Sequence, residues 1–132
     1  MSAPKPAAML AADLFDAFAR RDMAAATALI APDAVWMFPG TRGGLAGDHK
    51  GREAIFGFLF KVMSLTGGTF HAERHDLIGD DRVAFMHFTG RAERDGKRLE
   101  NPTCLRLVFE NGMLTEAREW VWDLGHVDEF WS

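Results

Sequence analysis

Hydrophobic residues recur at helical spacing near the beginning of the chain. Leu10, Leu14, Phe15 and Phe18 are interspersed with charged side chains. Apolar side chains at this spacing fall on one face of a helix. The pattern therefore predicts an amphipathic helix that follows a flexible start over residues 1–8.

Two more helices and a short strand are expected in the first half. The alanine-rich stretch 23–31 follows Asp22, whose carboxylate can cap a helix. Residues 52–65 are apolar on most sides, which predicts a helix that is covered on more than one face. A strand is expected over 34–38, and the glycine-rich segment 39–51 predicts a loop.

The second half of the chain has the pattern of extended strands separated by turns. Asp95-Gly96 and Asn111-Gly112 favour type I′ hairpin turns, because these residues tolerate positive φ. Pro102 cannot donate to a sheet and predicts a bulge or bend. The four long strands expected are residues 69–78, 82–94, 98–110 and 113–124. Helices followed by such a meander predict an α+β domain, with three helices packed on one face of a curved, mostly antiparallel sheet.

Composition narrows the class of protein. The 132 residues, 48% of them hydrophobic, are enough for one domain with its own core, so we expect a single domain over residues 1–132. A formal net charge of −4 and scattered basic residues argue against a nucleic-acid partner. We expect no membrane association and a cytoplasmic protein, because no long apolar run is present and Asp13 interrupts any signal-peptide pattern.

Four segments together resemble the nuclear-transport-factor-2-like superfamily, in its branch of SnoaL-like polyketide cyclases and ketosteroid isomerases. They are the first helix running into MAAATALIAPDAVWMFPG, then HKGREAIFGFL, DGKRLENP and ENGMLTEAREWVWDLGHVDEFWS. The resemblance implies a cystatin-like, cone-shaped α+β barrel that encloses an apolar pocket, usually in a homodimer. It implies no single reaction, because the fold carries several enzyme classes and binding proteins.

The residues that a ketosteroid isomerase would need are missing. By this resemblance the general base would stand just before Pro39, where the chain has Phe38, and the oxyanion donors would stand at Leu14 or Phe15 and at Leu105. The chain contains no Tyr at all. One lost oxyanion donor costs about a hundredfold to a thousandfold in rate, so we exclude that mechanism.

Two carboxylates on the last strand are the main catalytic candidates. With the concave face assigned from the resemblance, Glu119 and Asp123 point inward and Trp120 and Trp122 outward. Asp123 matches the general base of SnoaL-like cyclases, and Glu119 would assist it. Alternatively, Asp123 caps the following turn and Glu119 pairs with an arginine. A register error of one residue would exchange the two pairs.

His71 is the expected proton-shuttling partner, because an imidazole titrates near neutral pH. A structural hydrogen bond or a solvent-facing position is the alternative for this side chain. His71 and His75 stand about 13 Å apart on a strand, too far to share a metal ion. We expect neither a metal nor a cofactor.

An apolar pocket is expected from side chains on the elements that wall it in the family. Its predicted lining is Trp36, Phe38, Phe58, Met63, Met86, Phe88, Asn101, Thr103 and Leu105. This composition suits a small apolar ligand. The outward Trp120 and Trp122 favour a homodimer through the outer sheet face. We therefore expect a cofactor-free cyclase, isomerase or dehydratase acting on an apolar carbonyl compound, or alternatively a non-catalytic binding or structural homodimer.

Overall fold

The computed structural model describes residues 5–41 and 44–132. A flexible start was expected over residues 1–8. Residues 1–4 lie outside the described residues, and the first helix already begins at Ala7. No helix in the described ranges is long and apolar enough to cross a membrane.

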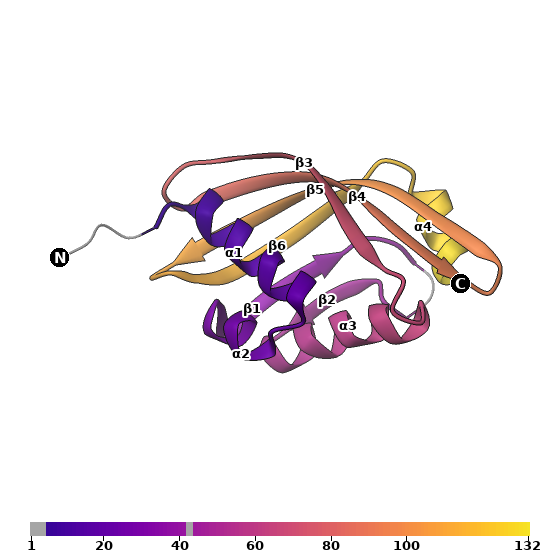
Figure 1. The fold of residues 1–132 in the computed structure, drawn as a ribbon, viewed down its shortest axis with the longest axis horizontal. Helices are drawn as coiled ribbons and strands as arrows, with labels where there is room; N and C mark the ends of the chain where they lie inside the picture. The colour runs from indigo at the N-terminus through magenta and orange to yellow at the C-terminus, as the bar shows by residue number, and fades with distance from the viewer. Residues whose placement is uncertain (1–4, 42–43) are drawn as a thin grey trace.

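Within the described residues the chain forms four helices and six strands (Figure 1). Their order is α1 (Ala7–Arg20), α2 (Met23–Ala28), β1 (Ile30–Phe38), β2 (Gly47–Lys50), α3 (Arg52–Leu65), β3 (His71–Gly79), β4 (Val83–Arg94), β5 (Lys97–Glu110), β6 (Met113–Val121) and α4 (Leu124–Trp131). The expected α+β class is confirmed.

All six strands of the described residues form one curved sheet in the order β2-β1-β6-β5-β4-β3. Only β1 and β6 pair in parallel, and the other neighbours are antiparallel. The sheet curls around α1 and α3 without closing (Figure 1). The mostly antiparallel, strongly curved sheet is therefore as expected, although it is an open sheet and not a closed barrel.

Two hairpin turns fix the register of the long strands. Asp95 and Gly96 both have positive φ, and so do Asn111 and Gly112, as a type I′ turn requires. The expected bulge at Pro102 is wrong, because the β4–β5 register runs unbroken past it. The carbonyl of Pro102 accepts a hydrogen bond from the backbone N–H of Trp122, just beyond the end of β6. Since β6 ends before this position, the missing N–H of Pro102 removes no hydrogen bond between β5 and β6.

The helices cover the concave face of the sheet. Helix α1 packs on β3, β4 and β5, while α3 packs on β1 and β2. The core between them includes Leu14, Ile55 and Leu107, which are completely buried. Helix α4 packs against β5 at one end of the sheet (Figure 1).

Two elements were not expected from the sequence. Strand β2 lies in the glycine-rich segment predicted as a loop, and it pairs with the end of β1. Helix α4 is capped by the Asp123 carboxylate and buries Val127, Phe130 and Trp131. The described part of the chain therefore contains four helices, not three. Helix α2 also ends earlier than expected, and β1 continues through Pro32.

Candidate active site

A cavity of about 750 Å³ lies between α1, α3 and the concave face of the sheet. Its volume is within the range of small-molecule sites. Aromatic side chains are the most frequent in its wall. The aromatic side chains of the wall are Phe15, Phe18, Trp36, Phe38, Phe56, Phe58, Phe60, Phe70, Phe88 and Trp131.

One carboxyl group stands in this apolar wall. Glu119 lies on β6 and faces the cavity, while its neighbour Trp120 points to the outer face of the sheet. The indole Nε1–H of Trp36 donates to Glu119 Oε2 over 2.7 Å. The parallel pairing of β1 and β6 brings these residues together, because Trp36 is aligned with Ala117. The bond leaves Oε1 of Glu119 available to a bound molecule.

Burial in the cavity changes the acidity of this group. Loss of hydration raises the pKa of Glu119 to about 7, although the hydrogen bond from Trp36 acts in the opposite direction. Burial disfavours the charged form of a carboxyl group, which explains why the pKa of Glu119 is raised. At neutral pH both the protonated and the ionised forms of Glu119 are therefore populated.

A second polar group faces the cavity from β5. Asn101 is buried, with only 6% of its surface exposed, and it lines the cavity. Its Oδ1 accepts no hydrogen bond from any described residue. A buried amide oxygen without a partner costs free energy, which a bound hydrogen-bond donor would recover.

Most of the expected lining residues reach the cavity. Those that do are Trp36, Phe38, Phe58, Met63, Phe88 and Asn101, and the catalytic candidates His71 and Glu119 also line it. Met86, Thr103 and Leu105 do not line it, which corrects their assignment to a ligand site. These three side chains are completely or almost completely buried in the core. They share the inward face of their strands, but the packed helices cover that part of the sheet.

Asp123, expected as the general base, has a different position. It is exposed and does not belong to the described lining of the cavity. Its Oδ1 accepts from the backbone N–H of His126 at 3.0 Å, so it caps α4. The geometry supports the capping alternative and does not support Asp123 as a base. The alternative that Glu119 pairs with an arginine is wrong, because its partner is Trp36.

His71 lies at the cavity wall but remains exposed. Its Nδ1 is 3.3 Å from the carbonyl oxygen of Thr69. Strand β3 is separated from β6 by β4 and β5, and no hydrogen bond joins His71 to Glu119 in the described part of the chain. The expected pairing of this imidazole with a carboxylate of β6 is therefore not formed.

Several lining residues were missed in the sequence. Phe15 and Phe18 were expected only on the apolar face of the first helix, and Trp131 was not among the expected lining residues. In the structure Trp131 lines the cavity, because α4 folds back against β5. Arg21 and Arg74 also line the cavity. Arg74 pairs with Asp16, so part of its charge is compensated.

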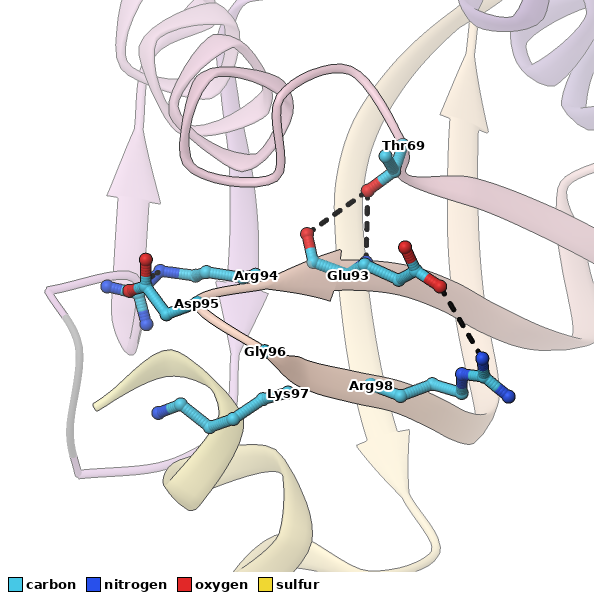
Figure 2. Close-up of a pocket in the computed structure, with 7 residues that line it drawn as sticks. All are labelled: Thr69, Glu93, Arg94, Asp95, Gly96, Lys97 and Arg98. Carbon is cyan, nitrogen blue, oxygen red and sulfur yellow. Dashed lines mark hydrogen bonds and ion pairs between the residues drawn. The ribbon is translucent and has the colours of Figure 1, made fainter.

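A second hollow of about 470 Å³ lies at the β4–β5 hairpin (Figure 2). Its side chains serve the fold. Thr69 bridges to the backbone of Glu93, and Figure 2 shows Lys97 directed toward α4. Arg94 donates to the carbonyls of Phe130 and Ser132, and Lys97 to that of Glu129. These bonds hold the end of α4, and with it the cavity wall at Trp131.

The outer face of the sheet has large exposed apolar groups. Trp120 is 47% exposed and Trp122 is 86% exposed. Phe85 and Ile78 pair across β3 and β4 and are also exposed. The guanidinium of Arg118 lies 5.6 Å from the ring centre of Trp120.

Comparison with known proteins gives the family. Residues 11–117 match the SnoaL-like domain. An uncharacterised protein of Mycobacterium tuberculosis is 29% identical over 119 residues, which cover 89% of this chain and 90% of the relative. The structure of Bal32a, from a soil-derived mobile gene cassette, is 39% identical and superposes with a TM-score of 0.90 over 95% of both chains.

A protein of unknown function from Xanthomonas campestris shares the cystatin-like fold. It is 24% identical and superposes with a TM-score of 0.89 over 97% of this chain and 99% of its own. The fold expected from the resemblance is therefore confirmed. With a largely apolar cavity and a match over most of its length, the chain belongs to the SnoaL-like family, whose fold is of the cyclase and isomerase type that binds small molecules.

Proposed function

We propose that this protein is a cofactor-free enzyme that moves a proton within an apolar carbonyl compound, as an isomerase or cyclase does. Glu119 is its acid and base. The observation that carries the proposal is a single carboxyl group in an aromatic cavity of about 750 Å³, with its pKa raised to about 7. A group with a pKa near the working pH both accepts and returns a proton efficiently.

The chemical step uses only groups of this chain. Ionised Glu119 takes a proton from the carbon next to the substrate carbonyl, and the C–H electron pair moves into the carbonyl to form an enolate. The carboxylic acid then returns the proton to another carbon, which completes an isomerisation. In a cyclisation the enolate carbon first attacks a second carbonyl, and the acid protonates the new alkoxide. No oxidant or co-substrate is needed.

The Trp36 indole supports this role in two ways. It fixes the orientation of the carboxyl group through Oε2, and its N–H stabilises the ionised form more than the neutral one. Without this bond, burial would raise the pKa of the carboxyl group further. The pair therefore keeps Glu119 ready to act as a base inside an apolar site.

A second candidate function is ligand binding without turnover. It is favoured by Phe38, which lines the cavity where related isomerases have a base, and by Leu105, which is fully buried in the core. Phe38 cannot act as a base, and Leu105 cannot supply an oxyanion hydrogen bond. The cavity would then be a binding site in which Glu119 serves only as a polar anchor.

Hydrogen exchange in a model ketone distinguishes the two functions. β-Tetralone is a bicyclic apolar ketone whose α-protons exchange with heavy water once a base removes them. Wild-type protein is expected to accelerate deuterium uptake, measured by NMR, and Glu119→Gln to lose at least about a hundredfold of that acceleration. Binding of β-tetralone without accelerated exchange would reject catalysis and leave the binding function.

We also propose that the protein is a homodimer through the outer sheet face. Trp120 and Trp122 present large aromatic surfaces there, and Phe85 on β4 is also exposed. Aromatic residues are enriched in protein interfaces, and a monomer rarely exposes several together. Pairing of two copies would remove these side chains from water while both cavities, on the opposite face, stay free.

A further inference from the structure

We infer that the cavity has a second polar subsite at Asn101, which binds a hydrogen-bond donor such as a hydroxyl or amide N–H at the far end of the ligand. The inference deepens the proposed function and rests on it. Asn101 lines the cavity, and its oxygen Oδ1 is buried and accepts no hydrogen bond from the described residues. An amide oxygen in that situation lacks a donor that a ligand can supply.

The strand register separates this subsite from Glu119. Glu119 pairs with Leu105 across β5 and β6, and Asn101 is four residues from Leu105 along β5. Four residues of a strand span about 13 Å. The backbone positions of the two polar groups are therefore about 13 Å apart along the strands, which fits an elongated molecule with a carbonyl near one group and a donor near the other.

A glycine leaves space beside the amide. Gly90 on β4 pairs directly with Asn101 and also lines the cavity. A Cβ atom at Gly90 would lie 3.3 Å from the Phe70 ring and 3.9 Å from Cβ of Asn101. The absence of this atom keeps the end of the cavity open for a ligand group. Phe70 and Leu99, which also line the cavity, add apolar contacts to the ligand body.

The donor requirement can be tested with two probes of nearly equal shape. β-Naphthamide carries an NH₂ group where methyl β-naphthyl ketone carries a methyl group, so only the amide can donate to Oδ1. Binding is followed by isothermal titration calorimetry or by the fluorescence of the protein's tryptophans. The quantity compared between variants is the ratio of the two dissociation constants, which cancels the different hydration of the probes.

The variant Asn101→Leu removes the acceptor at similar size. Its preference for the amide over the ketone is expected to be about tenfold weaker than that of the wild type, the effect of one buried hydrogen bond. Glu119→Gln, altered at the other end, is expected to keep the wild-type ratio. Gly90→Ala fills the space beside Asn101 and is expected to weaken binding of the amide more than binding of the ketone. Thermal unfolding verifies that each variant folds.

Two results would overturn the inference. An unchanged ratio in Asn101→Leu would show that Oδ1 receives no ligand donor, for instance because a buried water satisfies it. A ratio that changes only in Glu119→Gln would assign the amide to the other end of the cavity. Failure of both probes to bind wild-type protein would instead reject the cavity as a ligand site, and with it the proposed function.

Discussion

The indole N–H of Trp36 lies 2.7 Å from a carboxylate oxygen of Glu119, although the two residues are 83 positions apart in the sequence. Strand β1 enters the sheet parallel to β6 and makes this contact possible. The contact places a polar pair in an aromatic wall, and several measurable consequences come from it.

Replacement of Glu119 by glutamine is expected to change how stability depends on pH. The pKa of Glu119 is about 7 in the folded protein and near 4.5 when unfolded, so the folded state binds more protons between these values. Stability of the wild type therefore falls as pH rises through this window, by about 3 kcal/mol from this group. Glu119→Gln is expected to lose this decline, as measured by denaturant unfolding at about pH 4 and pH 8. The raised pKa would be contradicted if the free energy of unfolding changed by the same amount between about pH 4 and pH 8 in both proteins.

Trp36→Phe removes the indole N–H and keeps an aromatic ring. The hydrogen bond from Trp36 lowers the pKa of Glu119, so its loss is expected to raise that pKa above about 7. NMR titration of ¹³C-labelled glutamate carboxyl groups measures the shift directly. Phe58→Leu, which changes an aromatic wall residue without a hydrogen bond to Glu119, is the control. A lower pKa in Trp36→Phe would contradict the assigned role of the indole.

Removal of the Arg94 guanidinium is expected to loosen the C-terminal helix. Arg94→Ala loses hydrogen bonds to the carbonyls of Phe130 and Ser132, with a cost of about 1–3 kcal/mol. Hydrogen exchange of the α4 amides is expected to accelerate, and β-tetralone to bind more weakly because Trp131 no longer lines the cavity. Arg98→Ala is the control, since Arg98 is exposed and pairs, among the described residues, only with Glu93. Equal exchange rates in the two variants would refute the role of this contact.

Loss of the exposed tryptophans is expected to weaken the proposed homodimer. The double variant Trp120→Ala and Trp122→Ala should shift sedimentation velocity toward the monomer at concentrations where the wild type is dimeric. Large aromatic residues often contribute 2 kcal/mol or more to an interface, which is roughly a thirtyfold change in dissociation constant. Met9→Ala, on the exposed side of α1, should leave the association unchanged. A monomeric wild type would reject the dimer.

Much of the fold was predictable because its signals are local. The turns at Asp95-Gly96 and Asn111-Gly112 determine which strands pair, and the register then determines which side chains share a face. Glu119 and Trp120 lie on opposite faces as expected, with the concave face assigned from the family resemblance. The short elements β2 and α4 were missed, since four and eight residues give too little periodicity to distinguish them from loop.

The candidate site was harder to predict, because it depends on contacts between distant segments. Asp123 follows the inward alternation of β6, but β6 ends at Val121 and the chain turns into α4, so the alternation no longer applies. Met86 and Leu105 also face inward, yet whether such a residue meets a cavity or a helix depends on where α1 lies. The unpartnered oxygen of Asn101 has no signature in the sequence at all.

The dependence on pH of proton exchange in β-tetralone tests the central claim most directly. If Glu119 is the base, the rate catalysed by wild-type protein rises with pH, has its midpoint at about 7 and is constant above it, because only the ionised form removes a proton. Glu119→Gln then shows no such midpoint. A catalysed rate with the same profile in both proteins would contradict the account.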